Sequence, residues 1–593
     1  MRRIGAALAL VSVMWAPAAD AFDLRFAIQT DKESVREAVE AASLLGTLPQ
    51  DPAPSGQEIL AAAQADYGRL ISALYDAGYF GPEVSIRLDG REVAAIPAIR
   101  APASVANVVV KVTPGRSFTF GRASVGPLSP QTEVPAGFAK GAVADLSAVR
   151  AAAQAAREGW RNLGHAKAEV SDQSITARHN AAELDVTLSI APGPKLTFGP
   201  LRLSGESAVR PERIRAIAGL PTGEVFSPSE LDRARNRLQR TGTFQAAALF
   251  EAEFPEGTAL PIDGQITDRL PRTFGFGAEV SSEDGLTLSG YWQHRNLFGG
   301  AERLRFDAEI GGIGGSATGV DFAFELRFDK PAIRGPDVDG YAFARADKLD
   351  ERHYSADRLA VEVGLINRKP RAYTYSYGIG SVYAEAEDAF GARDYWLLTL
   401  PATATYDTRD NPLNARSGLF GQLSLTPFAA LQGADHGLRT TLDLRSYRRL
   451  GDKVTLAFRG QVGSLAGPSL SRVPVDFAFY AGGGGSIRGF AYQSIGVDVA
   501  GGDVAGGRSF ATVSGEVRVQ TGDKLSVVGF VDSGFVQADV LPDITSGDWN
   551  TGVGLGVRYD TGLGPIRLDV ATPVGGPADE GGFEIYIGIG QAF

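Results

Sequence analysis

The chain has 593 residues, a formal net charge of −11 at pH 7 and no cysteine. This length exceeds that of one ordinary domain, so several domains are expected. The negative charge argues against a general nucleic-acid-binding protein, which needs a basic surface to contact phosphates. Without cysteine, no disulfide can hold the fold together. The 73 glycines argue against a helical enzyme and favour a chain with many strands and turns.

Residues 1–21 are predicted to be a secretory signal peptide. Arg2 and Arg3 form its positive region, residues 4–15 its apolar region, and Ala19-Asp20-Ala21 a cleavage site with two small residues. A membrane anchor is the alternative, but the apolar run is shorter than the ~20 residues that a spanning helix needs. No apolar run of about 18 residues follows, so an integral membrane protein of this sequence would not be helical.

The segment after the signal contains repeated sequence. PGRSFTFG occupies residues 114–121 and PGPKLTFG residues 192–199, and a glycine ends each of three helical patterns. A helix often ends at a glycine because the left-handed backbone there suits a residue without Cβ. The predicted helices are Gln57–Tyr75, Leu146–Leu163 and Pro228–Arg240, and the glycines are Gly78, Gly164 and Gly242.

Repeats of this length indicate small domains in series. We expect three α+β units of the form β-α-α-β-β, over residues 22–115, 116–193 and 194–269. They are either structural spacers or a binding array, because a mixed domain with an edge strand can accept an added strand from an extended partner. The sequence leaves both interpretations open.

From Thr273 the apolar pattern changes to a period of two. Such alternation indicates strands with one apolar and one polar side. A soluble sandwich shows it as well, but a densely charged polar side favours a transmembrane barrel, which turns apolar residues to lipid and polar ones to a wet lumen. We therefore predict an all-β, 16-stranded antiparallel barrel over residues 270–593. In VDFAFELRFD, one side holds Val320, Phe322, Phe324, Leu326 and Phe328, and the other holds Asp321, Glu325, Arg327 and Asp329.

The last predicted strand is FEIYIGIGQAF, residues 583–593. Glycine within a strand weakens it or lets another backbone approach. The glycines Gly588 and Gly590 fall on one face of this strand, and the other face carries Phe583, Ile585, Ile587, Ile589 and Phe593.

The most unusual stretch is FYAGGGGSIRGF, residues 479–490, inside a predicted connection of roughly forty residues. Loops that long are usually functional or disordered. The stretch lacks the dinucleotide-binding, phosphate-loop and nucleophile-elbow motifs. The other interpretation is a loop that folds back so that Arg488 meets acidic residues elsewhere. An exposed loop with an incidental arginine is the alternative.

SIRGF resembles the V/I-R-G-F/Y motif of the BamA/TamA superfamily of outer-membrane assembly factors. Two further stretches match that family, SGEVRV with Glu516 and GFVDSG with Asp532, and YDTRDNPLNARSGLF resembles a family turn. The amino-terminal repeats resemble its POTRA domains. The resemblance implies that Arg488, Gly489 and Phe490 lie on an extracellular loop inside the barrel, where the arginine contacts Glu516 and Asp532.

The resemblance also implies a function that is not enzymatic and uses no cofactor. The protein would insert barrel proteins or autotransporters into the bacterial outer membrane, with its POTRA domains in the periplasm. Three POTRA units favour the TamA branch, whose partner is an elongated, TamB-like periplasmic protein; unfolded clients and outer-membrane lipid are the other partners. Clients would pair with strand edges at a weak seam between the first and last strands, lined by Phe274, Phe276, Gly588, Gly590 and Phe593.

Other functions stay open at this point. A two-partner secretion translocator would export one dedicated unfolded protein through the lumen. A diffusion porin would have no need for the repeats, and a barrel enzyme would need a nucleophile and a base, which no motif supplies. Five scattered histidines and no cysteine argue against a zinc site, and DTRDNPLN, residues 407–414, is interpreted as a turn instead of a calcium loop.

Overall fold

The computed structural model describes most of the chain, and the predicted signal peptide lies outside the described residues. By its internal contacts the chain divides into two compact units, Met1–Pro200 with Thr222–Glu230 and Glu253–Pro261, and Leu201–Pro221 with Leu231–Ala252 and Ile262–Phe593. The described residues are 22–49, 53–281, 285–315, 319–369, 372–545, 548–561, 564–578, 581–589, 591 and 593.

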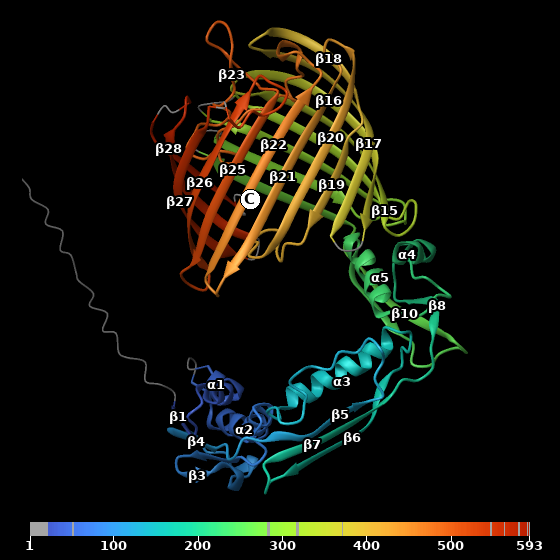
Figure 1. Cartoon of the computed structure of the whole chain (residues 1–593), viewed down its shortest axis with the longest axis vertical. Coiled ribbons are helices and arrows are strands. Elements are labelled where there is room, and N and C mark those ends of the chain that lie inside the picture. The colour runs from blue at the N-terminus through green and yellow to red at the C-terminus, as the bar shows by residue number, and fades with distance from the viewer. Residues whose placement is uncertain are drawn as a thin grey trace, which may run out of the picture. The chain divides into compact units, whose positions relative to one another are not determined.

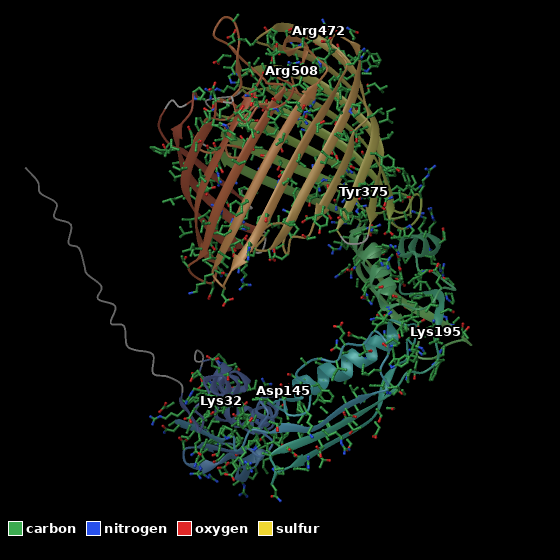
Figure 2. All side chains as sticks on the ribbon, in the orientation of Figure 1. Lys32, Asp145, Lys195, Tyr375, Arg472 and Arg508 are labelled. Atoms are coloured by element: carbon green, nitrogen blue, oxygen red, sulfur yellow. The ribbon has the colours of Figure 1, made fainter. Side chains whose placement is uncertain are left out.

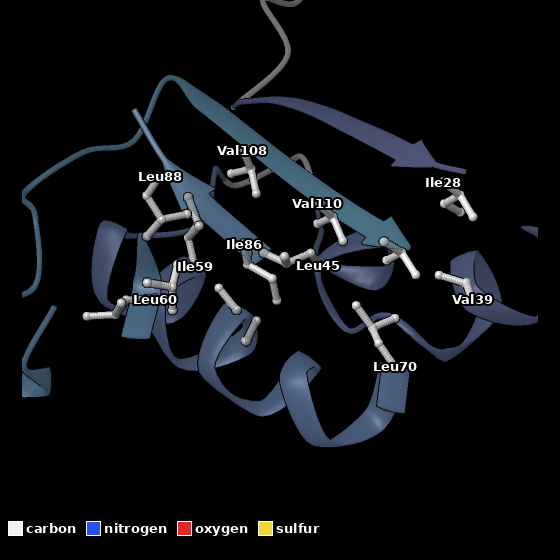
Figure 3. Packing of buried hydrophobic residues seen from close by; sticks show 14 of the residues in the cluster. Ile28, Val39, Leu45, Ile59, Leu60, Leu70, Ile86, Leu88, Val108 and Val110 are labelled. Atoms are coloured by element: carbon white, nitrogen blue, oxygen red, sulfur yellow. The ribbon is translucent and has the colours of Figure 1, made fainter. Parts of the chain in front are cut away.

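The first α/β domain has a four-stranded sheet in the order β1-β4-β2-β3. Ser55 and Glu58 form a capping box at the start of its long helix, which fixes where that helix begins. Apolar side chains from this helix and from the sheet meet in one core (Figure 3). The elements are β1 (Asp23–Ile28), α1 (Glu33–Ala42), η1 (Leu45–Thr47), α2 (Gly56–Asp76), β2 (Glu83–Leu88), β3 (Arg91–Glu92), η2 (Val93–Ala95), η3 (Ala98–Arg100) and β4 (Asn107–Thr113).

The second α/β domain differs from the expected pattern of two helices. Its sheet has the order β5-β7-β6, with β5 (Thr119–Gly126), β6 (Glu169–Arg178) and β7 (Glu183–Ala191), and α3 (Leu146–Arg161) is the one helix between β5 and β6 in this fully described stretch. The expected first helix is absent because residues 127–145 carry Pro127, Pro130 and Pro135. Proline lacks the N–H that a helix interior needs, and its ring clashes with the preceding turn.

The third α/β domain has a sheet in the order β8-β10-β9. Its elements are β8 (Thr197–Ser204), α4 (Pro211–Ala218), α5 (Pro228–Arg240), β9 (Phe244–Glu251) and β10 (Ala259–Asp268). The glycines predicted to end helices have positive φ, +86° at Gly78, +100° at Gly164 and +69° at Gly242. Among the described residues, no helix is both long and apolar enough to span a membrane.

The rest of the chain forms a closed barrel of antiparallel strands (Figure 1). β18 and β19 share one position between β17 and β20, because Leu400 and Pro401 interrupt that strand. The strands are β11 (Arg272–Ser281), β12 (Gly285–His294), β13 (Arg303–Ile313), β14 (Asp321–Lys330), β15 (Val338–Asp350), β16 (Tyr354–Lys369), β17 (Tyr373–Asp388), β18 (Gly391–Thr399), β19 (Ala402–Asp407), β20 (Gly418–Gln432), β21 (Gly437–Leu450), β22 (Val454–Ala466), β25 (Ser509–Gln520), β26 (Leu525–Gln537), β27 (Asn550–Thr561), β28 (Gly564–Gly575) and β29 (Glu584–Ile589).

The predicted alternation is confirmed in these strands. Phe324 and Leu326 are exposed on the outer, lipid side of β14, whereas Arg327 pairs with Asp329 on the inner side. An exposed row of tyrosines on β17 includes Tyr375 and Tyr377, and aromatic belts of this kind are typical of the membrane–water interface. The barrel thus has an apolar exterior and a charged interior.

Candidate functional site

The glycine-rich stretch lies in the connection between β22 and β25, residues 467–508, which contains a short hairpin of β23 (Val497–Asp498) and β24 (Val504–Ala505). Gly482 and Gly489 have φ of +103° and +97°, a left-handed backbone that favours glycine. The hydroxyl of Ser486 accepts from the Gly482 amide and donates to the Gly482 carbonyl, which closes a tight turn just before Arg488.

Arg488 is 2% exposed and makes three ion pairs with the barrel wall, two of them with the acids that the sequence singled out. Its Nε lies 2.6 Å and its Nη2 3.0 Å from the two carboxylate oxygens of Asp532 on β26, and its Nη1 lies 2.8 Å from Oε1 of Glu516 on β25. The guanidinium also lies 3.5 Å from the ring centroid of Phe530. The structure therefore brings together the three charged residues that the sequence singled out.

A third acid in this cluster was missed by the sequence analysis. Asp569 on β28 accepts from Nη1 of Arg488 at 3.3 Å and forms a second ion pair with Arg558 on β27. Glu516 likewise pairs with Arg518, whose Nε lies 2.8 Å away. Asp569 lies on the inner side of an alternating strand, but no motif distinguishes it from other charges on the barrel's inner side.

The cluster balances its charges, because three arginines meet three carboxylates. Burial opposes the charged form of Arg488, but hydrogen bonding to Asp532 and the charges of Asp532 and Glu516 outweigh it and raise the pKa of Arg488 above its ordinary value. An arginine fork that binds a carboxylate through two nitrogens has a defined direction as well as a strong attraction. We infer that this cluster attaches the loop to the wall in one orientation.

The next two residues of the motif contact the last strand. The Gly489 amide donates to the hydroxyl of Tyr586 on β29 at 3.1 Å, and that hydroxyl lies 3.3 Å from the carbonyl oxygen of Phe490. Phe490 is buried with Ile487 and Ile495 of the same loop. The loop is thus joined to β29 as well as to β25, β26 and β28.

The other residues predicted for the seam belong to the first and last strands of the barrel or to the residues after it. Among described residues, the pairing of β11 with β29 joins Ser281 to Tyr586. Phe274 and Phe276 on β11 are exposed, at 65% and 89%, and Gly588 lies on β29 opposite Arg567 of β28. Gly590 lies outside the described residues.

The alternation predicted that Phe593 shares one face of the last strand with Phe583, Ile585 and Ile587, but those side chains are exposed and Phe593 is not. Its side chain is 7% exposed and packs against Tyr447, Ala457 and Ala415, and its carbonyl oxygen accepts from Nη2 of Arg518 at 3.2 Å. The alternation sets the side of a residue only while the strand continues, and β29 ends at Ile589. Phe593 therefore lies beside Arg518 and not at the seam.

These features define an outer-membrane barrel with an inward-folded loop, preceded by α/β repeats. Residues 296–593 match the family model described as the Omp85 superfamily domain, and residues 196–258 match the POTRA model described as surface antigen variable number repeat. The first match covers half of the chain, so the chain belongs to the Omp85 superfamily. It is a bacterial outer-membrane protein with POTRA domains in the periplasm.

Individual relatives are distant. The chain is 23% identical over 439 residues to the outer membrane protein assembly factor BamA of Nitratidesulfovibrio vulgaris, with 71% of this chain and 54% of that protein covered. It is 25% identical over 371 residues to BamA of Neisseria meningitidis serogroup B, with 57% and 45% covered. The chain thus spans about half the length of these curated relatives.

Two solved structures share the fold. BamA from Haemophilus ducreyi lacking POTRA domains 1–3 aligns with a TM-score of 0.60 and 16% identity, covering 79% of this chain and 99% of that one. CdiB from Acinetobacter baumannii aligns with a TM-score of 0.50 and 12% identity, covering 80% and 90%. At these identities the likeness concerns the fold alone.

Proposed function

We propose that this protein is an outer-membrane assembly factor that inserts β-barrel proteins, including autotransporters, into the bacterial outer membrane. Within the superfamily we place it in the TamA branch, with an elongated TamB-like protein as its periplasmic partner. The basis is the arrangement of three POTRA-like sheets before one barrel. No reaction is catalysed in this proposal, and the free energy comes from client folding in the bilayer.

The observation that carries the proposal is the difference between the two sides of β29. On one side, β29 pairs with β28 from Glu584 to Ile589. On the other side, the described pairing with β11 joins Ser281 to Tyr586. In the part of the two strands that the structure describes, this pairing is shorter than that with β28, and an incompletely paired strand edge is a template for an added strand. A client strand would therefore pair there before it enters the lipid.

Client folding in reconstituted vesicles tests the proposal. Urea-unfolded autotransporter barrel is added to phospholipid vesicles that contain the full chain, and folding is followed by the heat-modifiable mobility of the client on gels. We expect faster folding than in vesicles that contain a diffusion porin at equal density. Equal rates would contradict the proposal.

The competing function is two-partner secretion, for which the CdiB fold offers a parallel. In that case an unfolded exoprotein would cross the same vesicles through the lumen, and the barrel client would fold no faster. The neighbouring genes would also distinguish the two functions. A gene for a TamB-like protein would support the assembly role, and a gene for a large exoprotein would support the translocator.

A further inference from the structure

The loop between β22 and β25 is attached to the barrel wall at a second place, before its glycine run. The side chain of Asp476 is 6% exposed, and its Oδ2 accepts from Nη1 of Arg358 on β16 at 3.0 Å. Its Oδ1 accepts from the hydroxyl of Tyr395 on β18 at 2.8 Å. Arg358 is itself held by Asp347 on β15, with Nη2 to Oδ2 at 2.7 Å.

Two further wall arginines bind the main chain on either side of Asp476. Nη2 of Arg393 on β18 donates to the carbonyl oxygen of Val473 at 2.9 Å, and Nε of Arg439 on β21 donates to that of Phe477 at 3.1 Å. The wall therefore binds the backbone of the loop at Val473 and Phe477 as well as the carboxylate of Asp476. Around them lies an apolar cluster in which loop residues Val473, Val475, Phe477 and Phe479 pack with wall residues Tyr395, Leu397, Phe428 and Leu465.

The two attachments lie on different sides of the barrel. Asp476 contacts β16 and β18, whereas Arg488 contacts β25, β26 and β28. In the closed order of strands, the first set is separated from the second by β20, β21 and β22 on one side and by β29 and β11 to β15 on the other. The segment from Asp476 to Arg488 runs between the two attachments along the inner wall, where Arg439 of β21 and Arg459 of β22 donate to the carbonyl oxygens of Phe477 and Gly485. Figure 2 shows Arg472 and Arg508, which flank this segment, at the same end of the barrel.

The charges of the two attachments are reversed. At the first, the loop supplies the acid and the wall the arginines; at the second, the loop supplies the arginine and the wall the acids. A swapped docking would place Asp476 among Glu516, Asp532 and Asp569, and like charges at close range repel. The opposite charges of the two attachments therefore favour one direction of the segment along the wall.

We propose that Asp476 is a positioning residue that holds the first half of the loop against the inner wall, through Arg358 and Tyr395, independently of Arg488. The loop is then a strap fixed to the wall at both ends. Removing one partner of a buried ion pair leaves the other charge without a counterion. Loss of Asp476 would thus free the first half of the strap while the second half stays attached.

Cysteine labelling tests this, because the native chain contains no cysteine. Val475→Cys reports on the first attachment and Ile487→Cys on the second, since both native side chains are buried. Each reporter is combined with Asp476→Asn in the full chain, and labelling by a membrane-impermeant maleimide is timed. We expect Asp476→Asn to speed labelling of the Val475→Cys reporter about tenfold or more and to leave the Ile487→Cys reporter unchanged.

The matched control is Asp498→Asn, the same chemical change at an exposed acid of the same loop. It should change neither reporter. Tyr395→Phe removes one of the two contacts of Asp476 and should give an intermediate rate at the Val475→Cys reporter. If Asp476→Asn exposes both reporters together, the loop has one cooperative attachment and the proposal is wrong; if it exposes neither, Asp476 does not hold the strap.

Discussion

Gly552 on β27 lies so close to Arg488 that a Cβ added to residue 552 would overlap the carbonyl oxygen of Arg488. Gly552 is also the cross-strand partner of Asp532, the main carboxylate of the attachment. The wall therefore contacts Arg488 in two ways. Asp532 binds its guanidinium, and Gly552, which has no side chain, leaves room for its main chain. Both are needed for Arg488 to reach its position.

Gly552→Ala should therefore displace the main chain of Arg488 from the barrel wall without removing any charge. We expect trypsin to cleave after Arg488 in the folded variant, because the added methyl group displaces the main chain that buries this residue. The measurement is the rate of cleavage in detergent micelles, identified by mass spectrometry. Gly460→Ala is the matched control, since a Cβ there meets nothing within 4 Å, and it should leave the site protected.

Exchanging the charges of Arg488 and Asp532 tests whether the two residues form an ion pair in the folded protein. Arg488→Asp and Asp532→Arg should each cost about 3–5 kcal/mol of the free energy of unfolding, because each leaves buried like charges together. The double variant should recover part of this loss. Recovery stays incomplete, since an acid at 488 would still lie beside Glu516. Urea titration of the barrel in lipid vesicles measures all three, and singles that behave like the native chain would contradict the ion pair.

Asp569 is expected to matter as much as the acids that the sequence singled out. Asp569→Asn would leave the buried Arg558 without its carboxylate and weaken one contact of Arg488. The expected loss is about 3 kcal/mol or more in the same urea titration. Asp523→Asn, at an exposed turn residue, should cost less than about 0.5 kcal/mol.

A fourth prediction concerns the joint between helix α5 and the turn between β14 and β15. Arg237 binds both oxygens of Asp337, at 2.8 and 2.6 Å. Burial alone would raise the pKa of Asp337, but the hydrogen bonds and charge of Arg237 outweigh it and lower that pKa. The ion pair therefore stabilises the joint at any pH above the ordinary aspartate range and loses this contribution only as the pH falls through the lowered value.

Hydrogen exchange over residues 228–240 measures this joint. It should be unchanged between pH 7 and pH 5 after correction for the intrinsic rate. Arg237→Gln should speed exchange there about tenfold, the factor for the loss of one charged hydrogen-bond pair. Arg235→Gln, on the same helix but paired with Asp232, serves as the control. Equal effects of the two variants would show that Asp337 does not hold the joint.

The helices were predicted well where the pattern of apolar residues continued without interruption. Pro228–Arg240 is a helix with the predicted bounds, and the predicted Gln57–Tyr75 is Gly56–Asp76 in the structure. The spacing of apolar residues and the capping residues determine such elements locally. The second α/β domain was mispredicted because its helix count was transferred from the neighbouring repeats, although three prolines in residues 127–145 exclude a helix there.

The site was predictable only where a motif marked it. Arg488, Glu516 and Asp532 lie in recognisable stretches, whereas Asp569 and Asp476 are ordinary acids in sequence. Their roles depend on which strands become neighbours when the barrel closes and on where a long loop meets its wall. Phe593 shows the same limit, because its inward position depends on Arg518, a residue far away in the sequence.

Strand exchange at the seam is tested most directly by a disulfide staple between the paired residues of β11 and β29. Ser281→Cys with Tyr586→Cys joins the two strands when oxidised, and Ala278→Cys with Leu288→Cys joins β11 to β12 as the control. Client folding is then measured in vesicles, with each reduced double variant as its own baseline. The account predicts that the oxidised seam staple stops client folding, that reduction restores it, and that the control staple has no effect. Client folding at the reduced rate while the seam staple is closed would contradict it.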